Sequence, residues 1–589
     1  MIKNSSRSKF LLSMLIAGYV GYVALIALCF LLFNLSEIKR VLIDSQFYFL
    51  EINFILIIIG FILVSKFIKN LILTIPRKII YILLGITISG VLITSFVAPQ
   101  THRIYYDEDI YQNIGQNLAS LQKAQLCIDG STVYGVYDCQ NGIYNKQPYG
   151  YPYLLSIVYR LFGVSETASF IFNNFLLGFS IFIVFLITFL LFKNYKIGIF
   201  AALMYTLIPQ NLLWFSTTAA EPSTALFGAI FILSLIIYLK EKSNRSLFLA
   251  IVTASFAIQF RQESILLIFV ALLSIIIYKP SEFKSMRIYN AGLLLLALSF
   301  GFIIHLFVTS GDSWGTTAAK FSLDYFSHNF TVNSLFYVDN IKFPILFTLF
   351  FLSSFFAKSF LKEKILLAVW FFCFWGVFLF FYAGSYEYGA DVRYSLVSYF
   401  PLVILGGLGV YQLQAFLKNN LSLKSYLNPI VGIMITISFL KFLPQVRAET
   451  QEGWGARADH LYAKEFATLL PENSIVLTHN PNMFHLWGKN AAQISLATTE
   501  KSYVNQILFH QYEEGVYLHW NFWCNAADSL QSSFCDNILN DYKVDLIKEY
   551  KENDYRYVLY RLGLKDQEEI PFQKAKYPKL ESPIFNLVK

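Results

Sequence analysis

The stretch YYDEDIYQNIGQNLASL (residues 105–121) follows a long apolar segment and carries three consecutive carboxylates, Asp107, Glu108 and Asp109. A cluster of acids stands out here, because only 14% of the chain is charged. Apolar residues of the stretch recur at three- and four-residue steps, which predicts an amphipathic helix. The acids begin this helix, so we expect them where an apolar span meets an aqueous compartment.

The composition predicts a polytopic α-helical membrane protein. Of its 589 residues, 56% are hydrophobic and 18% aromatic, whereas soluble domains are about 45–50% apolar. The excess comes in runs of roughly 17–25 residues, the length of a membrane-spanning helix. About 13 spans are predicted. They cover residues 10–33, 47–67, 78–98, 168–192, 195–214, 219–239, 246–260, 262–279, 287–309, 341–357, 365–383, 394–416 and 427–444.

The basic residues predict the orientation of these spans. If the N-terminus (MIKNSSRSKF) is cytoplasmic, every other loop on that side is basic, as in KNYK (193–196) and KEKSNR (240–245). The opposite loops hold most of the acids. The net charge of +8 is therefore explained by membrane topology and does not indicate nucleic-acid binding. We expect the protein in the cell (inner or plasma) membrane, with membrane lipids as partners.

This topology divides the chain into four regions. The C-terminal one reads as a mixed α/β soluble fold, because SIVLTHN and YRYVLYRLG are typical of buried strands and HLYAKEFATLL has helical spacing. The predicted regions are N-terminal transmembrane helices (1–98), a first large exterior loop with interfacial helices (99–167), a transmembrane core (168–444) and a C-terminal exterior, periplasmic or extracellular domain (445–589).

Four of the six cysteines lie in the exterior regions as two close pairs. Such pairs are typical of disulfides in an oxidising compartment. We expect Cys127 to bond to Cys139, and Cys524 to Cys535.

The acidic stretch has two interpretations. An aspartate at the N-cap and acids in the first turn stabilise a helix through capping and the helix dipole. Capping requires one acid, however, and lipid phosphates disfavour surplus negative charge here. A general base acting on a lipid-borne substrate is the second interpretation.

Further acids and arginines gather at other exterior helix ends. The stretch QPYGYPYLLSIVYRLFG (147–163) predicts a second interfacial or re-entrant helix. Arginines on this side do not help to retain cytoplasmic loops, so they are candidates for gripping phosphate bidentately. The residues at these helix ends are Glu221, Pro222, Arg261, Glu263, Asp391, Arg393 and Tyr394.

The ordered set resembles the membrane glycosyltransferases of the GT-C class, especially protein O-mannosyltransferases and aminoarabinose lipid A transferases (glycosyltransferase family 39-like). DEDIYQNIGQNL fits the family's acidic motif at Asp107, Glu108 and Tyr111, whereas Gln147 replaces a family histidine. Glu221-Pro222, RQESIL (261–266) and RYSLVSYFPLV (393–403) match later motifs. The resemblance covers about residues 100–410, and three spans precede the acidic loop where the family usually has one.

The resemblance implies an integral membrane glycosyltransferase, a hexosyl- or pentosyltransferase that uses a polyprenyl-phosphate sugar as donor. Asp107 would be the base of an inverting reaction, and Glu108 would orient the acceptor or bind a cation. Arginines would neutralise the phosphate leaving group. The implied donor-phosphate residues are Arg393, Arg261 and Tyr394, and the implied acceptor or cation residues are Glu221, Asp109 and Tyr111.

Several questions stay open at this point. The acceptor is a protein, a lipid or a glycan, and a divalent cation is an open option. An oligosaccharide transferase or polymerase using a diphosphate-linked glycan is the alternative enzyme, although no WWDYG-type signature is present. A transporter or flippase of lipid-linked substrates is the alternative outside enzymes. It is disfavoured because no inverted repeat or mid-membrane charge is evident.

The topology is testable by cysteine accessibility. Single cysteines placed in KEKSNR (240–245) and KNNLSLK (418–424) should react with an impermeant reagent only from the cytoplasm. A cysteine near Trp520 should react only from outside, and reversed labelling would contradict the orientation.

Overall fold

The computed structural model describes residues 2–104, 106–312, 318–356, 359–387, 389–420, 427–448, 454–526 and 529–565. Tyr105, Lys358, 421–424 and 566–589, which the sequence predictions include, lie outside the described residues. The chain forms two compact units. The first unit contains Met1–Glu472 and Asn480–Gln493, and the second contains Asn473–His479 and Ile494–Lys589. The predicted exterior domain (445–589) thus contributes residues to both.

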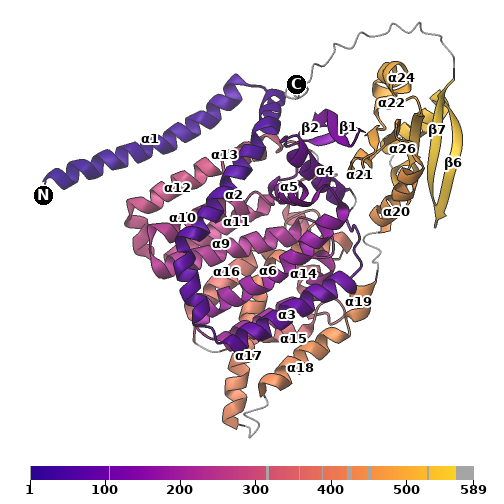
Figure 1. The fold of residues 1–589 in the computed structure, drawn as a ribbon. Helices are drawn as coiled ribbons and strands as arrows, with labels where there is room; N and C mark the ends of the chain where they lie inside the picture. Colours follow the sequence, from indigo (N-terminus) through magenta and orange to yellow (C-terminus); the bar gives the residue numbers. More distant parts are fainter. Residues whose placement is uncertain are drawn as a thin grey trace, which may run out of the picture. The chain divides into compact units, whose positions relative to one another are not determined.

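Each predicted span contains at least one helix of the first unit (Figure 1). The long helices are α1 (Ile2–Leu32), α2 (Leu35–Leu73), α3 (Arg77–Phe96), α6 (Glu166–Phe192), α9 (Glu221–Glu241) and α17 (Leu396–Asn420). The shorter ones are α7 (Tyr195–Thr206), α8 (Pro209–Trp214), α10 (Asn244–Ala257), α11 (Leu266–Tyr278), α12 (Met286–Leu298), α13 (Phe300–Val308), α14 (Phe326–Val338), α15 (Ile345–Ser353), α16 (Leu361–Val377), α18 (Leu427–Leu440) and α19 (Leu443–Arg447).

Six of the described helices are long and apolar enough to cross a membrane, and α12 with α13 makes a seventh if that pair, bent by 55°, is one span. The prediction of a multi-pass helical membrane protein is confirmed. The predicted number of spans is larger, because several apolar segments form shorter or broken helices such as α7 with α8.

Helix α2 begins earlier than the sequence analysis predicted. Residues 34–46 were expected to form a loop, but the helix starts at Leu35. Asn34 accepts a hydrogen bond from the backbone N–H of Glu37, and the Glu37 carboxylate accepts one from the backbone N–H of Asn34 (2.9 Å each). This reciprocal pair is a capping box, which satisfies amide groups that a helix start otherwise leaves free.

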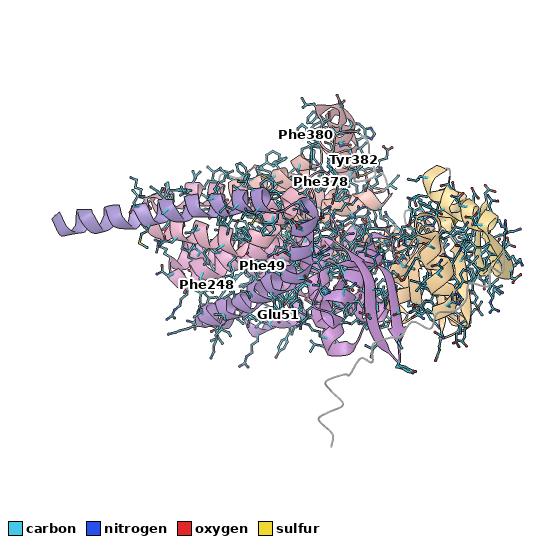
Figure 2. The ribbon with its side chains drawn as sticks, turned by 90° about the horizontal axis from the view of Figure 1, so that it is seen from above. Phe49, Glu51, Phe248, Phe378, Phe380 and Tyr382 are labelled. Atoms are coloured by element: carbon cyan, nitrogen blue, oxygen red, sulfur yellow. A yellow bond between two sulfur atoms is a disulfide. The ribbon has the colours of Figure 1, made fainter. Side chains whose placement is uncertain are left out.

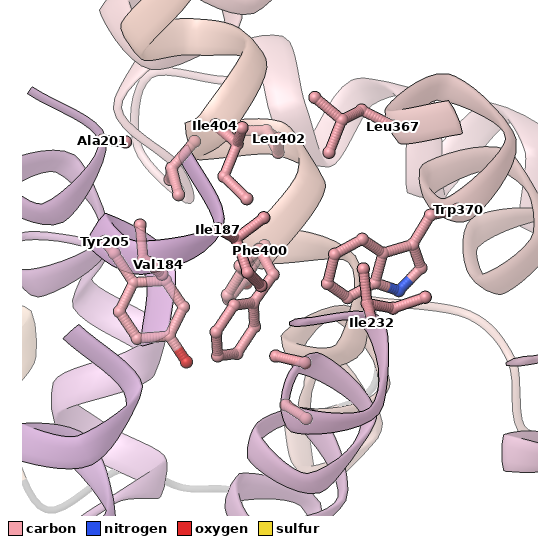
Figure 3. Close-up of a cluster of buried hydrophobic side chains, with 14 of the residues drawn as sticks. Val184, Ile187, Ala201, Tyr205, Ile232, Leu367, Trp370, Phe400, Leu402 and Ile404 are labelled. Carbon is pink, nitrogen blue, oxygen red and sulfur yellow. The ribbon is translucent and has the colours of Figure 1, made fainter. Parts of the chain in front are cut away.

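Aromatic and branched side chains fill the space between α6, α7, α9, α16 and α17 (Figure 3). Phe400 of α17 lies between Tyr205 and Trp370, at ring-centroid distances of 4.7 and 6.1 Å. All three side chains are buried. Their burial fixes α17, and with it the residues just before its start, against the neighbouring helices.

Small residues let the neighbours of α17 approach closely. A Cβ atom at Gly409 would lie 1.9 Å from the carbonyl oxygen of Phe350 in α15. A Cβ atom at Gly407 would lie 2.6 Å from the carbonyl oxygen of Ile197 in α7. Close backbone approach at glycine is a usual packing device of membrane helices.

The segments of the first unit that were predicted to be exterior contain short helices and a three-stranded sheet. The helices are α4 (Asp107–Ser120), α5 (Gly150–Phe162), α20 (Trp454–Leu469) and α21 (Pro481–Leu486). The strands are β1 (Leu126–Val133), β2 (Val136–Ile143) and β4 (Asn490–Gln493), in the order β2-β1-β4 with antiparallel pairing. Tyr134 and Gly135 both have positive φ (51° and 76°), as the tight turn of this hairpin requires.

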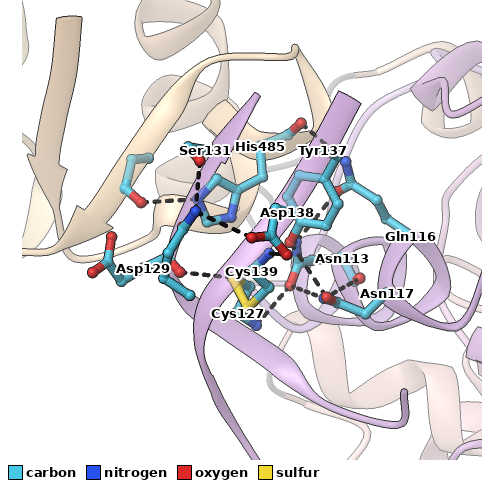
Figure 4. Close-up of a disulfide and its surroundings, with 12 residues drawn as sticks. Asn113, Gln116, Asn117, Cys127, Asp129, Ser131, Tyr137, Asp138, Cys139 and His485 are labelled. Carbon is cyan, nitrogen blue, oxygen red and sulfur yellow. Dashed lines mark hydrogen bonds between the residues drawn. A yellow bond between two sulfur atoms is a disulfide. The ribbon is translucent and has the colours of Figure 1, made fainter. Parts of the chain in front are cut away.

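Both predicted disulfides are confirmed. Cys127–Cys139 joins β1 to β2, with the Cα atoms 5.8 Å apart, and Figure 4 shows it beside α4. Cys524–Cys535 joins α25 (Phe522–Asn525) to α26 (Ser529–Asp541) in the second unit.

The second unit is mixed α/β. Its strands are β3 (Ser474–Thr478), β5 (Gly515–Trp520), β6 (Tyr542–Glu552) and β7 (Tyr555–Leu564), in the order β3-β5-β7-β6. The first pair is parallel and the other two are antiparallel. Short helical segments connect them: α22 (Leu496–Thr499), α23 (Lys501–Tyr503), a π-helical turn (Val504–Leu508) and α24 (Phe509–Gln511). The predicted strands 474–480 and 555–563 correspond to β3 and β7.

The close contact at Gly409 predicts that alanine will have different effects at two glycine positions. Gly409→Ala should lower folded yield and unfolding temperature in detergent, because α15 must move away from α17. Gly376→Ala, where no atom lies within 4 Å of the added Cβ, is the matched control and should behave like wild type. Equal behaviour of the two variants would contradict this packing.

Candidate active site

Helix α4 starts directly at the acidic stretch. Asp107, Glu108 and Asp109 occupy its first three positions, and the N-cap is Tyr106, whose side chain makes no capping hydrogen bond. Tyr106 has φ 58°, a left-handed conformation that is uncommon outside glycine. None of the three acids is therefore the N-cap. Successive helical residues differ by about 100° in direction, so the three carboxylates point to different surroundings.

Glu108 is fully buried and fully hydrogen-bonded. One carboxylate oxygen accepts from the backbone N–H groups of Arg103 (2.7 Å) and Ile104 (3.1 Å). The other accepts from the backbone N–H and the hydroxyl of Thr218 (2.8 and 2.9 Å). Glu108 thereby ties the segment before α4 to the segment before α9.

The sequence-predicted Glu221, Arg261 and Arg393 come together at the start of α9. Glu221 is 1% exposed, and its Oε1 accepts from Arg261 Nη1 (2.6 Å) and from Arg393 Nε (2.9 Å). Three segments far apart in sequence therefore share one carboxylate oxygen. The two guanidinium groups compensate the buried negative charge of Glu221.

Tyr394 lies against both guanidinium groups. Its ring centroid is 5.0 Å from Cζ of Arg261 and 4.5 Å from Cζ of Arg393, within the range of cation–π contacts. Arg393 also donates to the Tyr394 hydroxyl (2.9 Å) and to Asp391 (3.1 Å).

The two arginines differ in the donors that they leave open. Arg393 uses Nε, Nη1 and Nη2 in bonds to the protein. Arg261 uses Nε towards Glu263 and Nη1 towards Glu221, and no described residue accepts from its Nη2. Arg261 is therefore the better placed of the two to contact a bound anion.

Asp107 is half-buried, and within the described residues no group forms a hydrogen bond or ion pair with its carboxylate. Burial raises the pKa of Asp107 above its ordinary value, and Arg393 and Arg261 act in the opposite direction as the nearest positive charges. Both carboxylate oxygens thus remain available to an incoming proton.

Tyr111 lies one turn further along α4. Its ring is buried and makes an edge contact with Tyr151 of α5 (centroids 5.8 Å apart). Burial and the charge of Asp107 hold the pKa of Tyr111 well above its ordinary value, so the phenol stays protonated.

A cavity of about 250 Å³ opens beside Arg261. Gln147, which stands where the related families have a histidine, and Lys320 lie at its wall. The apolar lining residues are Pro148, Ile265, Leu266, Phe321, Val377, Phe378 and Phe381. Figure 2 shows Phe378 close to Phe380 and Tyr382. Gln262 and Glu263 also line the cavity, and Glu263 is paired with Arg261. A largely apolar wall with Arg261 and Lys320 suits an amphiphile with an anionic head.

The polar face of α4 is covered by protein rather than open to water. Asn113 accepts from the backbone N–H of Cys127 (2.9 Å), and Asn117 donates to the Asn113 carbonyl (2.9 Å; Figure 4). Gln116 donates to the carbonyl of His485 in α21 (3.2 Å). The hairpin and α21 thus hold the helix from the side that was expected to face solvent.

Asp109 faces a different group of residues, which the sequence analysis did not find. Its Oδ1 lies 3.7 Å from His102 Nδ1 and 3.6 Å from His460 Nδ1. The two imidazole rings are stacked, with centroids 4.2 Å apart. Glu166, the first residue of α6, lies on the other edge of both rings, 3.5 Å from His102 Nε2 and in close contact with His460 Nε2.

Burial alone would lower the pKa of His102, but the charges of Asp109, Glu108 and Glu166 outweigh it and raise the pKa to about 9. The cluster therefore favours a positive charge at its centre. His102 and His460 are more than 350 residues apart, and with Glu166 they follow no motif. No sequence pattern could therefore connect these three residues.

The comparisons with known proteins agree with this arrangement. The family described as dolichyl-phosphate-mannose-protein mannosyltransferase matches residues 146–305, which include α5, α6, Glu221 and Arg261. The crystal structure of ArnT from Cupriavidus metallidurans bound to undecaprenyl phosphate has the same fold, with a TM-score of 0.52 at 11% identity. It covers 82% of this chain and 98% of ArnT. The resemblance to GT-C glycosyltransferases is confirmed.

Two further structures show weaker similarity. The archaeal oligosaccharyltransferase AglB from Archaeoglobus fulgidus, in complex with an inhibitory peptide and a dolichol-phosphate, gives a TM-score of 0.46 at 12% identity over 83% of this chain and 75% of AglB. The mycobacterial arabinofuranosyltransferase AftD gives 0.48 at 11% identity over 84% of this chain and 40% of AftD. No curated protein sequence matches the chain.

The contacts of Glu108 predict that its removal affects stability first. Glu108→Ala should strand three buried backbone N–H groups, each costing about 1–3 kcal/mol, and Glu108→Gln should be intermediate because its amide cannot accept. Thermal unfolding in detergent measures the loss. Asp107→Asn, one residue earlier, is the control and should unfold like wild type; a stable Glu108→Ala protein would contradict the anchoring role.

Proposed function

We propose that the protein is an integral membrane glycosyltransferase that moves a sugar from a polyprenyl-phosphate donor to an acceptor on the outer face of the membrane. The observation that carries this proposal is that Asp107 interacts electrostatically with a pair of arginines, of which Arg261 lines an apolar cavity. The resemblance to GT-C glycosyltransferases supports the same class of reaction.

In the proposed reaction, the acceptor hydroxyl oxygen attacks the anomeric carbon of the sugar. The bond from that carbon to the phosphate oxygen breaks, the lipid phosphate leaves with the electron pair, and the configuration inverts. Asp107 takes the acceptor proton as the new bond forms. Among the described residues its carboxylate has no hydrogen-bond partner, which suits this role because the lone pairs can accept from the incoming hydroxyl.

The donor would bind with its phosphate at Arg261 and the start of its lipid chain in the cavity. The open Nη2 of Arg261 supplies donors towards the phosphate, and Lys320 lies on the cavity wall. The undecaprenyl phosphate of the ArnT structure is an amphiphile of this kind. Charge on the leaving phosphate grows in the transition state, so a preorganised guanidinium stabilises it.

Arg393, Glu221 and Tyr394 would act mainly by holding Arg261 in place. Glu221 orients both guanidinium groups through one oxygen, and Tyr394 lies against their faces. Tyr111 would donate to the acceptor or to Asp107, since its phenol stays protonated and interacts electrostatically with Asp107. We assign Glu108 the positioning of Asp107, since its own oxygens are already bonded within the protein.

Asp107 and Arg261 should give different phenotypes when changed. Asp107→Asn keeps volume but removes the base, so transfer should fall by roughly 10²–10⁴ with lipid binding largely retained. Arg261→Ala should weaken binding of undecaprenyl phosphate, measured by native mass spectrometry, and also lower the rate. The transfer assay contains labelled hexosyl- or pentosyl-phosphoundecaprenol as donor and host cell envelope as acceptor. Release of undecaprenyl phosphate from the donor measures the rate.

The controls are Asp138→Asn and Arg160→Ala, which change an acid and an arginine away from this site. Both should retain transfer and lipid binding. A normally expressed and fully active Asp107→Asn protein would contradict the role of Asp107. Transfer from diphosphate-linked donors alone would contradict the choice of donor.

A further inference from the structure

Three nitrogen and oxygen atoms converge beside α4, and none of them has a hydrogen-bond partner among the described residues. They are His102 Nδ1, Asp109 Oδ1 and His460 Nδ1, and each is buried. The side chains of His102 and Asp109 are 3% and 5% exposed. Buried polar atoms are almost always satisfied in proteins, so three unsatisfied atoms at one place require an explanation.

We propose that His102, Asp109 and His460 bind a Zn²⁺ ion through these three atoms. One ligand atom from each residue lies within 4.8 Å of the others. Asp109 Oδ1 is 3.7 and 3.6 Å from the two imidazole nitrogens. A tetrahedral zinc with bonds of about 2.0–2.2 Å separates its ligands by roughly 3.3–3.5 Å, so the two distances from Asp109 need to shorten by only a few tenths of an ångström. The two imidazole rings are stacked at an interplanar angle of 27°, so binding also requires them to tilt until both Nδ1 atoms point at the ion.

The surroundings of the three ligands resemble the support that zinc sites receive. The opposite nitrogens of both rings face the Glu166 carboxylate, which fixes the tautomers that leave Nδ1 free for the metal. The second oxygen of Asp109 accepts from the Asn480 side chain (3.0 Å). Lys464 pairs with the second oxygen of Glu166 (3.0 Å), so this carboxylate too is held from outside.

The donor set selects the kind of metal. Two imidazoles and a carboxylate suit Zn²⁺, whereas Ca²⁺ and Mg²⁺ prefer six or more oxygen ligands. Without a metal, the same residues would form a network of ion pairs around protonated histidines. In that network His102 Nδ1 is 3.5 Å from Glu108 Oε2, and Asp109 Oδ1 is 3.7 and 3.6 Å from the two imidazole nitrogens. These distances are longer than ordinary hydrogen bonds, whereas the Zn²⁺ site would give each of the three atoms a ligand bond.

The ion would clip together three segments of the first unit, which are the one before α4, α4 itself and α20. Glu166 at the start of α6 would support the two histidine ligands from their opposite nitrogens. Asp109 is two residues after Asp107 on the same turn, so the clip would fix the direction of the Asp107 side chain. The role is structural, because neither the metal nor its ligands need to touch the sugar. The inference therefore goes beyond the proposed function and does not depend on the transfer reaction.

Metal content tests the site directly. Full-length protein purified in detergent without chelator should hold about one Zn²⁺ per chain by inductively coupled plasma mass spectrometry. Zinc K-edge absorption of the wild-type protein should show two imidazoles and oxygen ligands and no sulfur. After chelation, added Zn²⁺ should raise the unfolding temperature.

Variants locate the ion. Asp109→Asn and His460→Asn should each weaken zinc binding about 100-fold or more, measured by competition with a fluorescent indicator. Glu166→Gln should weaken it by roughly 10–100-fold and retain the stoichiometry at saturation. His328→Gln, an exposed histidine elsewhere, is the matched control and should bind zinc like wild type.

Two outcomes would overturn the proposal. Wild-type protein that neither contains zinc nor gains stability from it would show that the cluster is an ion-pair network. Undiminished binding by Asp109→Asn and His460→Asn would place the ion elsewhere. These outcomes would not affect the role of Asp107, which the transfer assay tests separately.

Discussion

The buried carboxylate of Glu108 is the contact on which the arrangement of the site depends. A charge removed from water is tolerated only if it is well compensated, and Glu108 is compensated by four hydrogen bonds from Arg103, Ile104 and Thr218. Since the two oxygens bond to different segments, the start of α4 and the start of α9 are fixed together. Asp107 is on the first of these starts and Glu221, with its arginines, on the second.

The helical geometry of one turn explains why three acids follow one another. Each residue turns by about 100°, so Asp107 and Asp109 point away from each other with Glu108 between them. Asp107 lies among the charges of Arg393 and Arg261, and Asp109 lies against two histidines. A single turn thus serves a chemical site, an anchor and a candidate metal site. A single acid at an N-cap could not supply all three of these functions, because each one uses a different carboxylate.

Much of the site could be predicted from the sequence, because its residues stand at the ends of apolar runs that the predicted topology places on one side of the membrane. Glu221, Arg261, Arg393 and Tyr394 are each next to an apolar run, and such runs return to the same face after every second span. Their mutual contacts could not be predicted, since they depend on which helices are neighbours. Arg393 was weighted above Arg261 in sequence, whereas the structure leaves the open donors on Arg261.

Other features lack a periodic signal. His102 and His460 are isolated histidines in irregular or polar segments, and only the folded chain brings them within one ring stack. The hairpin of β1 and β2 alternates poorly between apolar and polar residues, so its strands could not be recognised. The early start of α2 did have a local signal, the Asn34–Glu37 capping box. It was missed because the span was predicted from the apolar run of residues 47–67, which begins after this box.

The buried polar face of α4 has a consequence for how accurately Asp107 is placed. A helix whose polar side faces water can rotate, because water replaces any lost hydrogen bond. Asn113, Gln116 and Asn117 instead bond to the hairpin, to α21 and to one another, and the Cys127–Cys139 disulfide constrains the hairpin (Figure 4). A rotation by one residue would break these bonds in a buried environment, where each costs about 1–3 kcal/mol. It would also turn Asp107 by about 100°, away from the arginines. The network therefore allows one rotational setting of the helix, and that setting directs the free carboxylate to the proposed reaction.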